Sequence, residues 1–336
     1  MNSRIYTEYC LQIAEDAELL ALAEQVMPSQ PPPNVLFAAV QDLLLEDPKR
    51  SREARALARF YPAVSGRAVP NEPAFPALRA FCLAHAQELQ PGLRHGRTQT
   101  SVVHRCTTLL PAIGTLPRVS AAGGAVALLE VGPAAGLNLR LDHYRYRYEG
   151  NGARYHWGDP GSTPALSCAI RGNTPPTLPA KLQVVDRRGL ELSPLDLTNP
   201  RDIRWIRALV WPEHTERTRL MSEALEVASR VPAAIEEGDA TRDIEQAVQR
   251  MPTASPRVVF ATHAVYQMSE DGRRDMMSGL EKASRTAPID LVVVDSNLRG
   301  ESRIDWVAFT DGARQNRVAL GHADSHGRWI EWGRTQ

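Results

Sequence analysis

The feature that most constrains this chain is a nearly continuous apolar run, Ala125–Val131, that ends in a glycine turn. Such a run, bounded by glycines, is typical of a strand buried on both faces of a sheet. Similar runs recur at Leu182–Val185, Ala233–Ile235, Arg257–Thr262 and Ile289–Asp295. Helical patterns lie between several of them, at Arg201–Val231, Asp243–Arg250 and Gly272–Ser284. Strands that alternate with helices predict a parallel, doubly wound α/β sheet.

The end of the chain has a different pattern. Three short segments, Trp306–Thr310, Val318–His322 and Trp329–Trp332, resemble antiparallel strands that close one edge of the sheet. A mostly parallel sheet with a C-terminal antiparallel hairpin has the shape of the Rossmann-like class I methyltransferase fold. We expect residues 119–336 to form this domain. Residues 1–118 contain short helical patterns broken by prolines, and we expect them to form an N-terminal helical cap domain packed on it.

Composition narrows the class of protein. The 336 residues include 39 Lys and Arg against 39 Asp and Glu, which does not favour a nucleic-acid partner. No apolar run is long enough to cross a bilayer, and Glu8, Glu15, Asp16 and Glu18 argue against a secretory leader. The four cysteines are far apart and favour a reducing compartment without a zinc site or disulfide framework. We expect a soluble cytoplasmic protein for a small-molecule substrate, with no metal and no membrane partner; the sequence does not indicate an oligomeric state.

The glycine turn carries the main chemical signal. In Leu128–Asn138 a strand runs into a tight turn, where the backbone can approach a ligand. Glu130 stands two residues before the first glycine, where a carboxylate would repel a pyrophosphate and suits a cationic amino-acid or sulfonium ligand. Ala134 replaces the middle glycine of the usual pattern, and an ordinary strand-to-helix turn is the alternative interpretation. The residues expected to bind S-adenosylmethionine here are Glu130, Gly132, Gly136 and Asn138.

Two segments follow later predicted strands. Asp239, followed by the small Ala240, could accept a hydrogen bond from an adenine amino group, although Gly-Asp is also common in surface turns. His263 ends another strand and is a candidate for proton transfer, with a structural histidine as the alternative. A ribose-binding acid is expected after the second strand of the sheet. Its candidates are Asp186, Glu191 and Asp196, which the residues alone do not separate.

An aromatic segment follows the glycine turn. Tyr144, Tyr146 and Tyr148 alternate with arginines, so the three rings share one face of an extended segment. Electron-rich rings could hold a sulfonium by cation–π attraction, which makes Tyr144 and Tyr146 candidate catalytic residues. The alternative is a half-buried strand pair at the edge of the sheet. Gln99 and Arg105 are candidate ligand contacts, because the Arg105 guanidinium could grip a carboxylate or instead pair with a surface acid.

At these residues the chain resembles a bacterial family known as a domain of unknown function. The resemblance runs nearly end to end and rests on a set of short motifs: Phe60-Tyr61-Pro62, Gln99-Thr100 with Arg105, Gly136-Leu137-Asn138-Leu139, Tyr144-Arg145-Tyr146, Trp157-Gly158-Asp159, Arg188-Gly189, Pro194-Leu195-Asp196-Leu197, Ala208-Leu209-Val210-Trp211-Pro212 and Gly238-Asp239-Ala240. Family members commonly read Gln-Thr-Asn-Glu where this chain has Gln99-Thr100-Ser101-Val102. The chain therefore lacks an Asn and an acid of that pattern.

The resemblance implies a fold like that of class I methyltransferases. The chain is also similar to the azetidine-2-carboxylate synthases of nonribosomal peptide pathways, which cyclise S-adenosylmethionine and release methylthioadenosine. This likeness makes ring closure the first function hypothesis, in secondary-metabolite biosynthesis. A small-molecule methyltransferase with His263 as its base is the second, and a non-catalytic S-adenosylmethionine-binding protein is the third.

Overall fold

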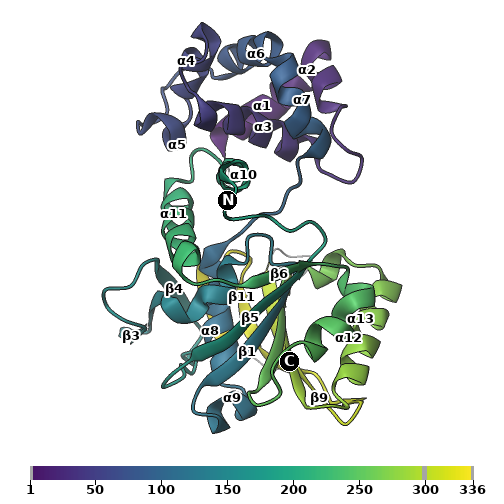
Figure 1. The fold of residues 1–336 in the computed structure, drawn as a ribbon. Helices are drawn as coiled ribbons and strands as arrows, with labels where there is room; N and C mark the ends of the chain where they lie inside the picture. Colours follow the sequence, from purple (N-terminus) through teal and green to yellow (C-terminus); the bar gives the residue numbers. More distant parts are fainter. Residues whose placement is uncertain (1–2, 297–300, 334–336) are drawn as a thin grey trace. The chain divides into compact units, whose positions relative to one another are not determined.

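A computed structural model describes residues 3–296 and 301–333 of the chain. The chain divides into two compact units (Figure 1). One comprises Met1–Thr100 with Asp196–Met221, and the other comprises Ser101–Leu195 with Ser222–Gln336. We call them the helical unit and the sheet unit.

The helical unit is built from short helices with clear start signals. They are α1 (Arg4–Ile13), α2 (Ala17–Ala23), α3 (Pro32–Glu46), α4 (Arg52–Ala58), α5 (Pro62–Ser65), α6 (Phe75–Ala84), α7 (Ala86–His95) and α10 (Pro200–Ala208). The side chains of Ser3, Asp16 and Ser51 cap α1, α2 and α4 by accepting backbone N–H bonds. The buried face of α1 packs its Tyr6 ring against Phe37 of α3, with 4.4 Å between ring centroids. These helices therefore share an apolar core of their own.

Helix α10 belongs to the helical unit although it lies a hundred residues further along the chain. The buried amide of Gln41 in α3 donates to the carbonyl oxygens of Arg207 and Val210, and Arg204 forms an ion pair with Asp42 at 2.8 Å. The predicted domain boundary at residue 118 differs from this division. Residues 101–118 belong to the sheet unit, and 196–221 leave it, because side-chain contacts rather than chain order decide where a short helix packs.

The sheet unit contains one large mixed sheet. Its strands are β1 (Ala125–Val131), β2 (Arg145–Gly150), β3 (Ala153–Trp157), β4 (Ala165–Arg171), β5 (Gln183–Glu191), β6 (Ala234–Glu237), β7 (Arg257–Thr262), β8 (Ile289–Ser296), β9 (Glu301–Thr310), β10 (Ala313–Arg314), β11 (Val318–Asp324) and β12 (Trp329–Trp332). They are ordered β3-β2-β4-β12-β11-β9-β8-β7-β1-β5-β6, and β10 pairs with β9. The strands β6-β5-β1-β7-β8 are mutually parallel, whereas β9 and β11 are antiparallel to their neighbours. The predicted α/β class, with a mostly parallel central sheet and an antiparallel C-terminal part, is confirmed.

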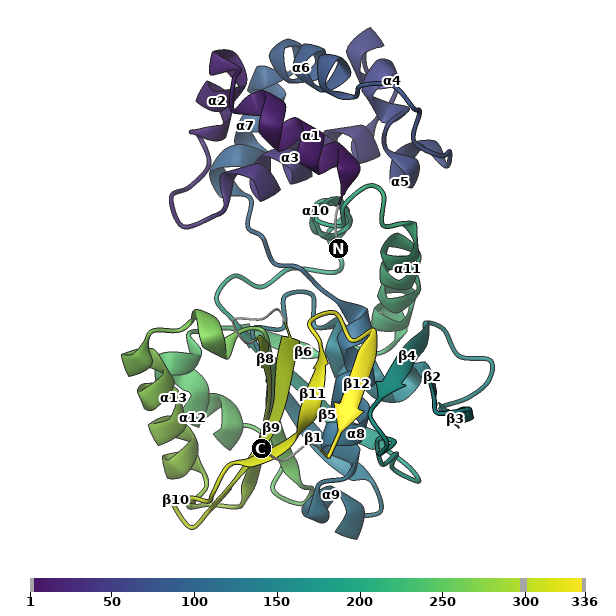
Figure 2. The same ribbon diagram turned by 180° about the vertical axis from the view of Figure 1, so that it is seen from behind.

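Helices cover both faces of this sheet. The sheet unit contains α8 (Cys106–Gly114), α9 (Pro117–Ala121), α12 (Ala240–Gln249) and α13 (Glu270–Ala283), with the 3-10 turns η1 (Val103–Arg105), η2 (Leu137–His143) and η3 (Val265–Gln267). Helix α11 (Thr215–Arg230) contains the boundary between the two units. Helices α12 and α13 lie side by side on one face (Figures 1 and 2), where Ala127, Leu129 and Val131 of β1 join their core. The alternate residues of β1 face α8 and η2, because Glu130 bonds to Asn138 of η2.

The strand order creates a switch point. After β1 the chain forms β2, β3 and β4 at the far end of the sheet. It then adds β5 and β6 on one side of β1 and returns to add β7 and β8 on the other side. In doubly wound sheets the connections diverge at such a point, and ligands bind beyond the carboxyl ends of the two central strands. Here those strands are β1 and β7. Across residues 3–296 and 301–333, none of the helices combines the length and apolar character needed to cross a membrane.

Candidate functional site

The carboxyl ends of the five parallel strands meet at one edge of the sheet. Glu130 lies near the end of β1, Glu191 ends β5, and Asp239 follows β6. His263 follows β7, and Asp295 lies near the end of β8. The structure therefore brings most of the predicted polar residues to the edge where a doubly wound sheet binds its ligand. Asp295 was not among the residues expected from the sequence. It could have been found as the acid that ends the apolar run beginning at Ile289.

The glycine turn after β1 has a left-handed backbone at three positions. Gly132, Ala134 and Gly136 have φ values of +67°, +51° and +64°. Glycine adopts this region without steric penalty, whereas alanine at 134 costs about 1–2 kcal/mol. Ala134 is buried, and its N–H donates to Glu191 at 2.8 Å, so the contact with β5 helps to hold the strained residue in place.

The backbone N–H groups of this turn have acceptors within the protein. Four bonds account for them: Gly132 to the Leu190 carbonyl, Ala134 to Glu191, Ala135 to the Ser101 hydroxyl and Gly136 to the Pro133 carbonyl. A pyrophosphate-binding turn needs N–H groups that point at the ligand. This turn therefore offers few free N–H donors to a pyrophosphate.

Glu130 is a buried acid with one unsatisfied oxygen. It is 1% exposed, and its Oε1 accepts a 2.8 Å hydrogen bond from Asn138, whose Oδ1 accepts from the Cys106 thiol at 3.4 Å. No donor among the described residues reaches its buried Oε2. Burial raises the pKa of Glu130 to about 8, against the opposing effects of the Asn138 hydrogen bond and the Arg140 charge. Oε2 can therefore accept a hydrogen bond, and no donor among the described residues supplies one.

The structure separates the three candidates for the ribose-binding acid. Glu191 ends β5, is 7% exposed and bonds directly to the glycine turn. Asp186 lies earlier in β5 and pairs with Arg188 at 2.8 Å. Asp196 lies in the helical unit, where it accepts hydrogen bonds from the N–H and hydroxyl of Thr198. Position favours Glu191 among the three candidates, because Asp186 lies earlier in β5 and Asp196 lies in the helical unit.

Asp239 has a structural task of its own. It is the N-cap of α12, and its Oδ1 accepts from the Thr241 N–H at 2.9 Å and from the Thr241 hydroxyl at 2.8 Å. Its Oδ2 faces the exposed Arg242 at 3.8 Å, too long for a hydrogen bond. Ala240 is buried as the first residue of α12. Asp239 thus caps the helix with one oxygen, while the other forms only a long ion pair with Arg242.

His263 and Asp295 form a second polar group at this edge. His263 has a φ of +56°, and its Nε2 lies 3.0 Å from the Ser302 hydroxyl. Burial and the Arg105 charge lower the pKa of His263 to about 3, so its ring is neutral near pH 7. Burial raises the pKa of Asp295 to about 6, and its Oδ1 is buried without a partner in the described part of the chain. The ring of Tyr266, 52% exposed, meets that of His263 edge-on.

The structure places Arg105 and Gln99 in different units. The Arg105 guanidinium donates from Nε to the Ser325 carbonyl at 3.0 Å, and its charge lowers the pKa values of Glu130, His263 and Asp295. Arg105 is therefore the cation common to both polar groups at the sheet edge. Gln99 belongs to the helical unit.

The tyrosines in β2 and directly before it are core residues. Tyr144, Tyr146 and Tyr148 are 0% exposed, and their hydroxyls donate to the carbonyl oxygens of Leu137, Leu141 and Thr107. The alternation places them on one face, as expected, but that face is buried. This packing favours the strand interpretation, and the catalytic role of Tyr144 and Tyr146 stays a prediction that these contacts do not support.

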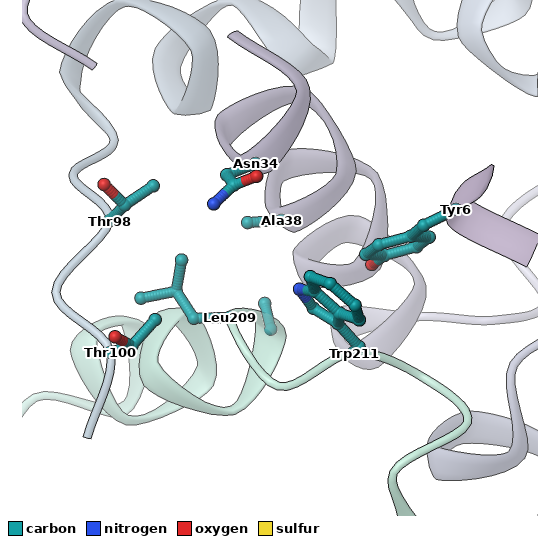
Figure 3. A pocket seen from close by; sticks show the side chains of 8 residues that line it. Tyr6, Asn34, Ala38, Thr98, Thr100, Leu209 and Trp211 are labelled. Atoms are coloured by element: carbon teal, nitrogen blue, oxygen red, sulfur yellow. The ribbon is translucent and has the colours of Figure 1, made fainter. Parts of the chain in front are cut away.

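The helical unit contains a small pocket (Figure 3). Asn34 and Ala38 come from α3, and Thr98 and Trp211 complete its wall with Tyr6, Thr100, Ala208 and Leu209. Its volume of about 20 Å³ holds about one water molecule. It contains none of the residues expected to bind ligand. In the part of the chain that the structure describes, no three His, Cys, Asp or Glu side chains are grouped to hold a metal ion.

The fold defines an α/β protein with a mostly parallel central sheet, and polar side chains gather at its switch point. The chain belongs to the DUF2332 family, described as "Uncharacterized protein conserved in bacteria", whose model matches residues 1–332. The expected end-to-end likeness to a bacterial family of unknown function is thus confirmed. No curated protein and no solved structure matches the chain.

Proposed function

We propose that the sheet unit binds S-adenosylmethionine at the carboxyl ends of β1, β5 and β6 and uses it in alkyl transfer. The observation that carries this proposal is the open oxygen of Glu130, which lies beside a glycine turn whose N–H groups are already occupied. A ligand with an ammonium group would supply the missing donor, whereas a pyrophosphate would find few free N–H donors in this turn.

The other acids fit the remaining parts of this ligand. Glu191 ends β5 beside the turn, where its carboxylate can accept from ribose hydroxyls. The Oδ2 of Asp239, which lies 3.8 Å from the exposed Arg242, would accept from the adenine amino group. The assignment therefore uses one acid at the end of each of three adjacent strands, β1, β5 and β6.

The first reaction we propose is ring closure of S-adenosylmethionine itself. Its α-amine would attack its own γ-carbon, and the carbon–sulfur bond would break with its electron pair moving to sulfur. The products would be azetidine-2-carboxylate and methylthioadenosine. The support is the family resemblance and a buried acid next to the expected position of the amine. A dry site favours this step because water is excluded from the reacting carbon.

Methyl transfer to a small acceptor is the second candidate. The observation that favours it is the group formed by His263, Asp295 and the half-exposed Tyr266 at the ends of β7 and β8. Ring closure makes no use of this group. An acceptor with a polar nucleophile could bind there, with the carboxylate of Asp295 as its proton acceptor.

One incubation separates these reactions. The full chain is mixed with S-adenosylmethionine alone, and the products are identified by mass spectrometry against a sample without protein. Ring closure yields methylthioadenosine and azetidine-2-carboxylate in equal amounts. Attack by the ligand's own carboxylate would give a lactone instead, so the cyclic amino acid is the diagnostic product. Adenosylhomocysteine that forms only with added small-molecule acceptors identifies methyl transfer, and binding without turnover identifies a non-catalytic protein.

A further inference from the structure

The carboxyl group of Glu130 is buried in surroundings that disfavour its ionised form. No cation of the described chain forms an ion pair with it, although its side chain is 1% exposed. Arg140, the buried arginine of η2, instead donates to the carbonyl oxygens of Gly136 and Val231. A carboxylate left in such surroundings would carry an uncompensated buried charge, which costs several kcal/mol. A proton on the carboxyl removes that charge.

The surroundings of Glu130 contain few groups that could compensate its charge. Asn138 of η2 donates to Oε1, and the thiol of Cys106 in α8 is engaged with Asn138. Arg140 and Arg105 favour the ionised form at longer range, while Glu191 of β5 disfavours it. Burial outweighs all of these, so the pKa of Glu130 is about 8 in the empty protein. Near pH 7 most molecules therefore hold this proton.

We propose that Glu130 exchanges its proton for the ammonium group of the bound ligand and then accepts a proton from that ammonium, which creates the nucleophilic amine. This inference rests on the proposed binding of S-adenosylmethionine. It assigns the base of ring closure to Glu130 rather than to His263, the sequence-based candidate for proton transfer. The Nε2 of His263 is already occupied by the Ser302 hydroxyl, and its pKa of about 3 makes the ring a weak proton acceptor.

The atoms and charges balance over one cycle. Binding of the ammonium form releases the Glu130 proton to solvent and leaves one proton between carboxylate and amine. That proton moves to Oε2, the nitrogen lone pair attacks the γ-carbon, and the sulfonium becomes a neutral thioether. The new ring nitrogen is a secondary ammonium, so the cyclic product leaves as a zwitterion. Glu130 is left protonated, as in the empty protein, and one proton has been released per turnover.

Calorimetry tests this exchange without any turnover. The full chain is titrated at pH 7 with adenosylhomocysteine, which has the ammonium group but no sulfonium, in buffers of different ionisation enthalpy. We expect release of about 0.9 proton per ligand bound, which is the protonated fraction for a pKa of about 8. Methylthioadenosine lacks the amino-acid portion and should release almost none. Because binding releases a proton, affinity for adenosylhomocysteine should fall roughly tenfold for each unit by which the pH is lowered below 7.

Variants sharpen the test. Glu130→Gln keeps the size of a protonated side chain and should abolish the proton release. Glu226→Gln removes one exposed acid of α11 and should leave the release unchanged. If the native protein binds adenosylhomocysteine without releasing a proton, the exchange is refuted while the proposed function stands. If none of S-adenosylmethionine, adenosylhomocysteine and methylthioadenosine binds, the proposed function and the exchange fail together. The native titration alone decides the matter if Glu130→Gln does not fold.

Discussion

Glu130→Gln should also change how stability depends on pH, even without ligand. The pKa of Glu130 is raised from 4.5 to about 8 in the folded protein, so between these values the folded state holds a proton that the unfolded state has lost. Stability contributed by this group is therefore present below about pH 4.5 and is lost as the pH rises towards 8. Glutamine has no proton to lose, so the variant should not share this decline.

The size of the effect follows from the width of that window. A shift of about 3.5 pH units at about 1.4 kcal/mol per unit gives roughly 5 kcal/mol as the largest difference. We expect the two proteins to differ by less than about 1 kcal/mol at pH 5, because a protonated carboxyl and an amide have similar size and polarity. At pH 8.5 the glutamine variant should be more stable by about 3–5 kcal/mol.

The assay is urea unfolding of the full chain at pH 5, 7 and 8.5. The chain has two compact units, so the transitions are followed by tryptophan fluorescence and by far-ultraviolet circular dichroism, and free energies are compared only where the slopes agree. Glu226→Gln serves as the control for loss of one exposed charge. The reasoning is refuted if the free energies of unfolding of the native protein and Glu130→Gln differ by the same amount at pH 5, 7 and 8.5. Glu130 would then not titrate in this range.

Three further predictions concern the turn, the adenine position and the buried rings. Gly132→Ala is compared with Gly123→Ala as its control, because φ is +67° and +63° at these positions and both variants carry a backbone strain of about 1 kcal/mol. Only Gly132→Ala also places a Cβ 3.1 Å from the Cβ of Ala264. In thermal unfolding and ligand titration, Gly132→Ala should therefore be less stable and lose at least about tenfold in S-adenosylmethionine affinity; equal behaviour of the two variants would move the site elsewhere. Asp239→Ser should keep the helix cap, whereas Asp239→Ala should lose about 1 kcal/mol of stability, and both should weaken ligand binding by about 1–3 kcal/mol. A serine variant that binds normally would leave Asp239 with capping alone. Tyr146→Phe should lose about 1 kcal/mol of stability and Tyr146→Leu about 3, with unchanged ligand affinity in both, because the ring is core; weaker binding by the leucine variant alone would restore a cation–π role.

The sequence by itself determined the class of the fold and the strand ends at which the candidate site residues lie. Continuous apolar runs between helical patterns are typical of strands buried on both faces, and such runs are visible in the local sequence, so the parallel core around β1 could be predicted. The alternation in β2 and the antiparallel end of the chain were visible for the same reason. Glu130 could be singled out because its distance from Gly132 along a strand is fixed by backbone geometry.

Only the tertiary structure decided the partners of these residues. The alternation of residues in an extended segment places three tyrosines on one face, but it does not say whether that face contacts a ligand or the core. The structure shows that the three side chains are buried and bond to carbonyl oxygens of α8 and η2. Asp196 and Glu191 are five residues apart and equally acidic, yet α10 packs with α3 and takes Asp196 into the helical unit. The raised pKa of Glu130 likewise depends on what surrounds it. Charge, burial and unit membership are set by residues distant in the chain, and local periodicity carries no information about them.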